Sequence, residues 1–489
     1  MTHATWQAVI GLELHVQLLT RSKLFSGAPT DYGADPNAQA SAIDLGYPGT
    51  LPVPNAEAVR LAVRFGLAIG ARIASRSVFA RKNYFYPDLP KGYQISQYEE
   101  PIVSDGRLAV RAEDGREFEV AIQRAHLEED AGKSVHDAFH GRSAIDLNRA
   151  GVPLLEVVSE PVLHTPEDAV ATMRTAHNLV RWLGICDGNM QEGSFRCDAN
   201  VSVRPLGGEL GTRVEIKNVN SFRFVEKALQ YEIERQIRVL ESGGAVAQET
   251  RLYDPALHRT RAMRGKESAH DYRYFPDPDL PPLEVPPELV AAERAALPEL
   301  PAARRERYRA EFGLGDYDAG MLTQERAVSE YFESLLTPAA ADPGQARAFA
   351  KLAANWVNGE LAAALNADQL SIDRSRVAAP ALAALLRRLH AGDISQHSAK
   401  EVFQALRSGA TDPDRVIAER GLSQVRDEGQ LANAIDEVIA ANPRQVAQFK
   451  NGDPKVLGWL MGQVMRATRG KADPARLDAL LRERIASAP

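Results

Sequence analysis

Leu12-Glu13-Leu14-His15-Val16-Gln17-Leu18, close to the N-terminus, alternates apolar and polar side chains along its whole length. A period of two is the pattern of a half-buried strand, whose apolar residues face a core while the polar ones face the other side. The same period recurs in residues 197–204 and 212–217. Sheets with one polar face are commonly antiparallel. We therefore predict an antiparallel sheet in the N-terminal part of the chain, with one face available for polar chemistry.

Two helices are predicted among these strands. Thr165 can cap a helix whose first turn holds Pro166 and two acidic residues, and Gly184 can end it. A second amphipathic helix is expected over residues 222–240.

The composition changes beyond residue 276. Eight prolines lie between residues 276 and 301, so this stretch is predicted to be a stiff linker rather than a regular helix or central strand. Residues 302–489 are rich in Ala, Leu, Arg and Glu with helical periodicity. One apolar stripe at helical spacing consists of Leu382, Leu385, Leu386 and Leu389. The predicted fold class is therefore α+β, with a sheet domain over residues 1–293, a helical domain over residues 294–405 and a helical tail domain over residues 406–489.

Bulk composition restricts the class of protein. The chain has 489 residues, of which 44% are hydrophobic and 25% charged, as in an ordinary globular protein. Cys186 and Cys197 are its two cysteines, too few for a disulfide framework or a four-cysteine zinc site, and this usage suits a reducing compartment. No run approaches the roughly 20 apolar residues of a membrane helix, and the N-terminus lacks the pattern of a secretory signal. We therefore expect a cytoplasmic protein with no membrane partner.

The net charge of −7 does not indicate a nucleic-acid partner, so RNA binding would require a local basic patch. Residues 441–489 contain nine Lys and Arg against four Asp and Glu. Such a tail can follow a phosphate backbone, and a solvated helix surface explains it equally well. The candidate RNA-binding side chains in it are Lys455, Arg466, Arg469 and Lys471.

Two segments combine carboxylates with an imidazole. Glu13 and His15 are two residues apart on the first predicted strand, so they share a face and can reach a common metal or substrate. Residues 126–133 place Glu128 and two further acids beside a histidine, a composition that suits a hard cation such as Mg²⁺. The alternatives are a solvated strand face for the first pair and an acidic turn for the second segment.

Glu156 interrupts an otherwise apolar run over residues 152–158. A carboxylate inside such a run is costly unless it is paired or bound to a cation. Glu156 is therefore the strongest single candidate for a functional acid. The structural alternative is a salt bridge to a nearby arginine such as Arg149.

Two more segments are dense in polar side chains. Arg196, Asp198 and Asn200 share the polar face of one predicted strand, and Arg196 can form a bidentate contact with a phosphate or carboxylate. Lys217 is a candidate for the charge that develops in phosphoryl transfer. Hydrogen-bonded strand ends or turns would explain both segments equally well.

Familiar nucleotide and hydrolase motifs fail. Gly132-Lys133-Ser134 resembles the end of a P-loop, but Leu127 stands where the first glycine is required. Neither a metalloprotease helix motif nor a Gly-x-Ser-x-Gly elbow is present. If ATP is used, the fold is not that of a P-loop enzyme.

Taken together, these segments closely resemble the B subunits of the bacterial glutamyl/aspartyl-tRNA amidotransferases, the GatB family. The resemblance runs nearly end to end and is carried by residues 11–18, 83–97, 126–133, 148–161, 192–200, 215–218, 271–279, 355–356, 458–462 and 468–472. Several of these motifs are eight or more residues long, so chance similarity is excluded in practice.

The resemblance implies an N-terminal cradle domain related to glutamine synthetase, followed by the helical and tail domains. It also implies a ligase reaction, in which ATP and Mg²⁺ activate the side-chain carboxylate of Glu-tRNA(Gln) or Asp-tRNA(Asn). Ammonia from a glutaminase A subunit then displaces phosphate, and a small C subunit completes the complex. Which of the two misacylated tRNAs is the substrate is left open by the sequence.

By position, the resemblance assigns the Mg²⁺ site to Glu13, His15, Glu128 and Glu156. Because histidine is an unusual Mg²⁺ ligand, an orienting role for His15 toward water or substrate stays open. Contacts to ATP or substrate are expected from Arg149, Arg196, Asp198, Asn200 and Lys217. Some relatives carry a cysteine-rich zinc site, but two cysteines are too few for it, so no zinc is expected here.

Two other functions remain compatible with these residues. A ligase of the glutamine-synthetase type acting on a small free acid would use the same acids and cations, but it would have no need of the basic tail. A non-catalytic RNA-binding scaffold would explain the tail, but not an acid inside an apolar run.

Overall fold

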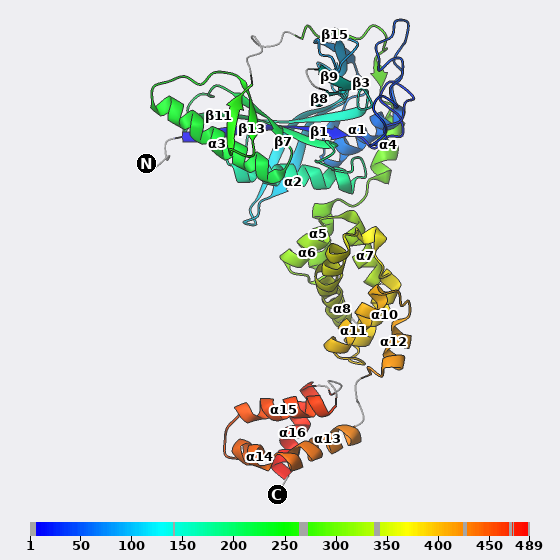
Figure 1. The fold of residues 1–489 in the computed structure, drawn as a ribbon, viewed down its shortest axis with the longest axis vertical. Coiled ribbons are helices and arrows are strands. Elements are labelled where there is room, and N and C mark those ends of the chain that lie inside the picture. Colours follow the sequence, from blue (N-terminus) through cyan, green and yellow to red (C-terminus); the bar gives the residue numbers. More distant parts are fainter. Residues whose placement is uncertain are drawn as a thin grey trace. The chain divides into compact units, whose positions relative to one another are not determined.

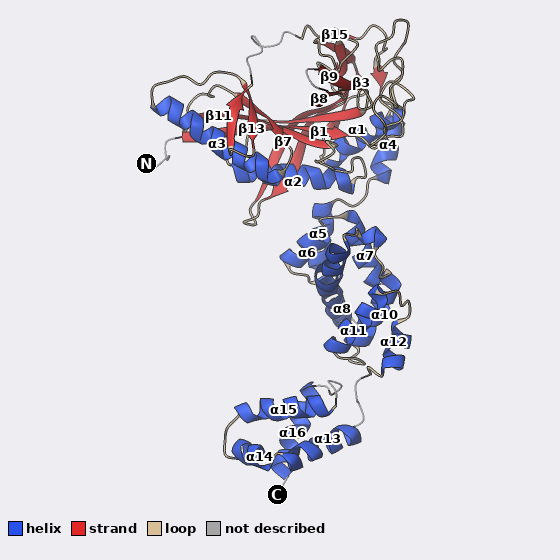
Figure 2. Ribbon diagram, viewed as in Figure 1, coloured by secondary structure: helices blue, strands red, loops and turns tan. Residues whose placement is uncertain are grey.

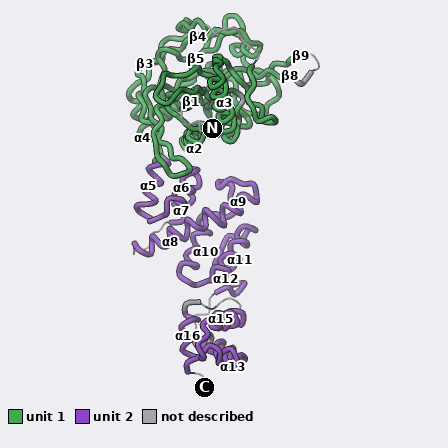
Figure 3. Tube along the Cα trace, turned by 90° about the vertical axis from the view of Figure 1, so that its left-hand side faces the viewer, with its two compact units in different colours: residues 1–300 green, residues 301–489 purple. Residues whose placement is uncertain are grey.

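The computed structural model describes residues 6–139, 142–263, 272–336, 343–423, 428–468, 472 and 474–487. The chain forms two compact units, Met1–Leu300 and Pro301–Pro489 (Figure 3). The N-terminal unit combines strands and helices, and the C-terminal unit is helical (Figure 2). The predicted α+β class is therefore confirmed. The domain boundaries at 293/294 and 405/406 stay predictions.

A nine-stranded sheet forms the centre of the N-terminal unit, in the order β14-β13-β12-β11-β1-β10-β7-β6-β2 (Figure 1). Its strands, in chain order, are β1 (Trp6–Gln17), β2 (Arg72–Ile73), β6 (Val103–Arg111), β7 (Glu117–Glu129), β10 (Pro153–Ser159), β11 (Phe195–Pro205), β12 (Val214–Val219), β13 (Thr250–Asp254) and β14 (Arg259–Ala262). Neighbouring strands pair antiparallel except β12 and β13, which are parallel. The predicted sheet is thus mixed rather than purely antiparallel.

Strand β1 lies near the middle of this sheet, and its alternation has the predicted meaning. Leu12, Leu14 and Val16 are buried in one hydrophobic core. That core includes residues from α1 (Ala56–Ala68), α2 (Pro166–Trp182) and α3 (Phe222–Glu241), and Figure 2 shows these helices along one side of the sheet. The polar residues of β1 are consequently directed to the opposite face.

Both predicted helices are present. Thr165 caps α2 by accepting a hydrogen bond from the backbone N–H of Asp168, and Gly184 follows the helix with φ +67°. Ser221 caps α3 in the same way, accepting from the N–H of Phe224. A positive φ just after a helix favours glycine, so the sequence signal that ends the first helix is confirmed.

The prediction that the proline-rich stretch is a linker without helix is wrong. Helix α4 (Pro287–Ala296) lies inside it, with a proline in its first turn, where the missing N–H costs no hydrogen bond. Glu293 of α4 is buried and accepts hydrogen bonds from Arg60 and Arg64 of α1. The prolines cluster at the two ends of this stretch, and the residues between them are good helix formers.

Small sheets complete the N-terminal unit. A three-stranded sheet consists of β15 (Phe275–Pro276), β4 (Phe79–Asn83) and β5 (Tyr93–Gln97). Two-stranded ribbons pair β3 (Arg76–Ser77) with β16 (Leu283–Glu284) and β8 (Lys133–Phe139) with β9 (Arg142–Asp146). Strand β5 packs on the end of β7, where Ser96 donates a hydrogen bond to Glu128 and the backbone N–H of Ile95 donates one to Glu129.

The described residues of the C-terminal unit form two separate hydrophobic clusters, one within residues 308–417 and one within residues 431–485. Its helices are α5 (Pro301–Phe312), α6 (Asp316–Leu322), α7 (Arg326–Leu336), α8 (Pro343–Trp356), η1 (Val357–Leu361), α9 (Ala362–Asp368), η2 (Ile372–Arg374), α10 (Ala379–His390), α11 (Gln396–Arg407), α12 (Pro413–Arg420), α13 (Glu428–Ala441), α14 (Pro443–Lys450), α15 (Lys455–Ala467) and α16 (Pro474–Ser487). Leu382, Leu385 and Leu386 of the predicted stripe are fully buried on α10. Among the described residues, every helix is too short or too polar to cross a membrane.

Candidate active site

The face of the nine-stranded sheet opposite the helices gathers the candidate acids, because cross-strand partners in an antiparallel sheet point to the same side. His15 of β1 is paired with Glu156 of β10 and, on its other flank, with Arg196 of β11. Glu13 is paired with Asp198 in the same register. Residues separated by more than 100 positions in the chain are thus direct neighbours.

Glu156 is the shared centre of this face. The Nε2 atom of His15 lies 3.4 Å from Oε1 of Glu13 and 3.5 Å from Oε2 of Glu156. His126 of β7 places its Nε2 atom 3.8 Å from the same Glu156 oxygen and 3.6 Å from Oε2 of Glu128. Two groups of possible metal ligands therefore overlap at Glu156.

A cavity of about 420 Å³ opens over these residues, and we call it the acid cavity. The candidate residues that line it are Glu13, His15, Glu128, Glu156, Arg196, Asp198 and Lys217. Asn200 lies one step further along the same face of β11, opposite Gly11. Arg149 lines a neighbouring cavity instead.

Glu156 and His15 of the acid cavity hold each other in their ionised forms. Burial would raise the pKa of the Glu156 carboxyl, but the positive charges of His126 and His15 hold it well below its usual range. Burial lowers the pKa of His15, but hydrogen bonds with Glu13 and Glu156 outweigh this and raise it to about 10. Glu156 is therefore a carboxylate, the form that binds a cation.

Lys217 supplies a positive charge at the side of the cavity formed by β11 and β12. Its Nζ atom donates a hydrogen bond to Oδ2 of Asp198 at 3.0 Å and lies 3.2 Å from Oε1 of Glu215. Burial opposes its charge, but these two carboxylates raise the pKa of Lys217 above its usual value. Lys217 thus stays protonated, and Asp198 and Glu215 hold its ammonium group in place.

Asp130 links the acid cavity to a second, larger cavity. Its buried carboxylate accepts hydrogen bonds at 2.8 Å from both Arg196 and Gln17, and the charges of Arg196 and Arg149 lower its pKa despite burial. Arg196 and Asp198 line both cavities. Asp130 therefore fixes the orientation of a guanidinium that faces both spaces.

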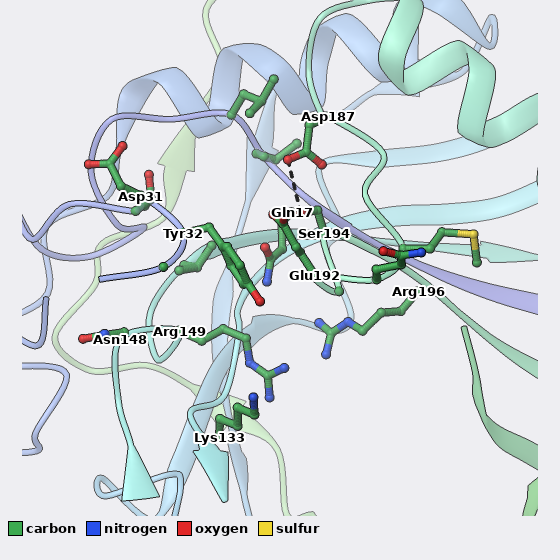
Figure 4. A pocket seen from close by; sticks show the side chains of 18 of the residues that line it. Gln17, Asp31, Tyr32, Lys133, Asn148, Arg149, Asp187, Glu192, Ser194 and Arg196 are labelled. Atoms are coloured by element: carbon green, nitrogen blue, oxygen red, sulfur yellow. Dashed lines mark hydrogen bonds between the residues drawn. The ribbon is translucent and has the colours of Figure 1, made fainter. Parts of the chain in front are cut away.

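The second cavity measures about 760 Å³, and we call it the cation cavity. Figure 4 shows the side chains of Arg149, Lys133 and Arg196 around one space, with Tyr32 and Glu192 opposite them. Arg149 also donates hydrogen bonds to the carbonyl oxygens of Ala131 and Gly132. The salt bridge from Arg149 to Glu156 that the sequence left open is thus not formed: the arginine is held beside Asp130 instead, 3.8 Å from its carboxylate.

Comparison with known proteins identifies the family. Residues 8–291 match the family model described as GatB/GatE catalytic domain, and residues 338–485 match the model described as GatB domain. The chain belongs to the GatB family. The catalytic-domain match contains every residue of the acid and cation cavities.

Curated relatives agree over almost the full length. The chain is 58% identical over 99% of its residues to the B subunit of the aspartyl/glutamyl-tRNA(Asn/Gln) amidotransferase of Alkalilimnicola ehrlichii, which it covers completely. Proteins of the same name from Thioalkalivibrio sulfidiphilus and Nitrosococcus oceani are 58% and 57% identical, each over 98% of this chain and 99% of the relative.

The donor set of this GatB-family chain fits a divalent cation. Each of the two overlapping groups offers ligand atoms that lie within 4.8 Å of one another. Carboxylate oxygens from Glu13, Glu128 and Glu156 are the ligands that Mg²⁺ prefers. His126 directs its Nε2 atom toward Glu128 and Glu156, and its buried Nδ1 atom has no hydrogen-bond partner among the described residues.

Sequence reasoning missed Lys82 and Tyr84, and it noted His126 and Asp130 within residues 126–133 without selecting either as a site residue. Residues 126–129 were open to interpretation as an acidic turn, but they belong to β7, so His126 and Glu128 share a face at the same spacing as Glu13 and His15. That repeated spacing could have identified His126. Lys82 lies on β4, and Tyr84 follows directly after its end. Both reach the cavity because the small sheet packs on β7, a contact that no local sequence pattern predicts.

Proposed function

We propose that this chain activates the side-chain carboxylate of Glu-tRNA(Gln), Asp-tRNA(Asn) or both with ATP and Mg²⁺, so that ammonia can form the amide. Its partners in this proposal are a glutaminase A subunit, which supplies the ammonia, and a small C subunit, in the cytoplasm. The names of the relatives support the reaction class, a carbon–nitrogen ligase acting on aminoacyl-tRNA. One arrangement carries the proposal: the carboxylates of Glu13, Glu128 and Glu156 line, with His15, a cavity that also presents Arg196 and Lys217, and His126 contacts two of these carboxylates.

The chemistry requires such a mixed site. A carboxylate resists attack by ammonia because its charge repels nucleophiles and oxide is a poor leaving group, whereas an acyl phosphate has a good leaving group. The site must therefore bring two anions together, the substrate carboxylate and the terminal phosphate of ATP. Glu13, Glu128 and Glu156, with His15 as ligand or orienting group, would hold Mg²⁺, which supplies charge neutralisation at the phosphates when bound.

The protein cations complete this neutralisation. Arg196 faces both cavities and is fixed by Asp130, so it can contact a phosphate that lies between them. Arg149 and Lys133 would attract the remaining phosphates of ATP in the cation cavity. Lys217 and Asp198 would lie beside the substrate carboxylate. Asn200, at the edge of the same face, would contact ATP or the substrate.

The test is amidation by the complete complex. The chain is co-purified with its A and C partners and incubated with misacylated tRNA, ATP, Mg²⁺ and ammonium chloride in place of glutamine. Formation of Gln-tRNA or Asn-tRNA together with ADP is expected. Amidation without ADP formation, or no amidation with either misacylated tRNA, would contradict the proposal.

A ligase acting on a small free acid is distinguished by the tail. Removing residues 428–489 leaves the cluster of residues 308–417 intact and deletes the basic α14 and α15. Under our proposal the truncated chain loses most tRNA-dependent ADP formation. An unchanged rate, or equal activity on free glutamate or aspartate, would favour the small-acid ligase.

A further inference from the structure

Four tyrosines near the acid cavity form a continuous series of ring contacts, which we call the tyrosine cluster: Tyr84, Tyr272, Tyr274 and Tyr98. The ring centres of Tyr84 and Tyr272 are 6.0 Å apart, and those of Tyr272 and Tyr274 are 6.1 Å apart, both edge-on. Tyr274 and Tyr98 are stacked with their centres 4.2 Å apart and their planes 7° from parallel. The series therefore runs from a cavity wall to the surface.

Hydrogen bonds fix the backbone that carries the cluster. The side-chain amide of Asn83, at the end of β4, donates to the carbonyl oxygens of Tyr272 and Arg273. The backbone N–H of Asn83 also donates to the oxygen of Tyr272. Arg273 adopts a φ of +44°, an uncommon conformation for a residue with a side chain. The polypeptide is thus held in a strained form that places two tyrosines on the side of the small sheet where Lys82 lies.

The inner end of the cluster belongs to the acid cavity. Tyr84 and Lys82 line that cavity with Glu128 and Glu156. The Lys82 ammonium also lies 4.9 Å from the ring centre of Tyr272. A cation beside aromatic rings suits a ligand that has both a phosphate and a flat base.

The outer end of the cluster is open to solvent, because Tyr98 exposes 49% of its surface. Isolated exposed aromatics need no explanation. Tyr98 is not isolated, because it stacks on Tyr274 in a series that leads to the acid cavity. Its half-exposed ring therefore offers an ordered flat surface to a ligand.

We propose that the tyrosine cluster binds the single-stranded 3′ end of the tRNA by stacking against its terminal bases. This inference rests on the proposed function, in which an aminoacyl ester on the last nucleoside must reach Glu156. Single-stranded RNA is held mainly by stacking on aromatic rings together with backbone contacts to cations. A path of rings that begins beside the carboxylates leads the nucleotides away from the reacting group and toward the surface.

The adenine of ATP is the competing occupant, and the extent of the cluster argues against it. ATP has a single base, whereas the four rings form a series that reaches from the acid cavity to the half-exposed Tyr98. Such a series suits successive bases of a single strand. The nucleoside that carries the amino acid then approaches from the tyrosine side.

Direct binding tests the inference. Affinity of the full-length chain is measured for an intact deacylated tRNA and for the same tRNA with its single-stranded 3′ end trimmed. The intact tRNA is expected to bind more tightly. In Tyr98→Leu this advantage should fall by about 5- to 10-fold, the loss expected for one stacked base, while Tyr98→Phe should keep it because the ring remains.

A control variant separates the outcomes. Tyr317→Leu removes an exposed tyrosine of α6 that is outside the N-terminal unit, and it should leave the advantage unchanged. The inference is overturned if Tyr98→Leu retains the full preference for the intact tRNA, or if it weakens ATP binding instead. Because these measurements need no turnover, they stand apart from the amidation assay: loss of amidation in the wild-type complex would contradict the proposed function and leave the binding result to decide this inference.

Discussion

The charged residues of the sheet face and those of the basic tail are arranged in opposite ways. On the sheet, His126, Glu128 and Glu156 expose only 4%, 3% and 7% of their surfaces, and each contacts another charged group. In the tail, Lys455 and Arg466 of α15 are exposed. Buried charges interact strongly and only in a defined geometry, whereas exposed charges act through their sum and are screened by salt. We therefore expect single substitutions to be decisive on the sheet and modest in the tail.

The largest effect is expected for Glu156→Gln. The amide has the same shape but removes the carboxylate that both histidines contact. Loss of one buried group that stabilises charge in a transition state typically lowers the rate about 100- to 1,000-fold. We expect a fall of at least about 100-fold in ATP-dependent amidation with ammonium, while tRNA affinity changes by less than about three-fold.

A matched control for this substitution is Glu119→Gln. Glu119 lies on the same β7 strand as His126, but it is exposed and pairs with Arg107, which is also exposed. Its replacement should leave the amidation rate within about two-fold of wild type, as for exposed ion pairs in general. Similar rates for the two variants would mean that Glu156 is structural.

The second-largest effect is expected on the stability of the fold, for a substitution of Lys23. Lys23 is fully buried and donates a hydrogen bond at 3.1 Å to Asp44, which is itself 3% exposed. Lys23→Met leaves that carboxylate buried without its cation, and we expect the free energy of unfolding to fall by about 3–5 kcal/mol. Urea denaturation followed by circular dichroism measures the change.

An exposed ion pair of the tail provides the comparison for Lys23. Arg482 and Asp478 of α16 form an i,i+4 pair at 2.8 Å, and their side chains are 55% and 39% exposed. Arg482→Gln should cost no more than about 1 kcal/mol. If the two substitutions cost the same, the contrast between buried and exposed charges in this chain is wrong.

Local patterns predicted the elements of the site but not their assembly. The period of two placed Glu13 and His15 on one face, and the interrupted apolar run identified Glu156, because both signals lie within a few residues. The pairing of His15 with Glu156, and of Glu156 with His126, depends on β10 lying between β1 and β7. That order is decided by long-range packing, which a local pattern does not contain. The same limit explains why Lys82 was missed.

Helix α4 illustrates the opposite error. The number of prolines in the whole stretch argued against a helix, although Pro287 stands in the first helical turn, where proline is favoured. Burial of Glu293 against α1 then holds the helix in the N-terminal unit. The spacing of the prolines, rather than their number, would have predicted helix α4.

The smallest effect is expected in the tail, for Lys455→Gln and Arg466→Gln. Arg469 and Lys471, the other two candidates, lie outside the described residues. Each substitution removes one exposed cation of α15, so it should weaken tRNA binding about two- to five-fold near physiological salt. It should also reduce the slope of log affinity against log salt concentration by about 0.7 to 1 for each phosphate that the variant no longer binds.

Salt dependence separates a direct phosphate interaction from a general loss of positive charge. Arg482→Gln removes the same charge from α16, but Asp478 already offsets it, so its slope should match that of wild type. If all three variants shift the slope equally, the tail attracts RNA only through its net charge and the two α15 positions have no special role. If Lys455 and Arg466 each bind a phosphate, the double variant should lose the sum of the two single effects, because exposed sites that share no partner are additive. The same additivity is not expected on the sheet, where His15 and His126 both act on Glu156 and the loss of either changes what the other can do.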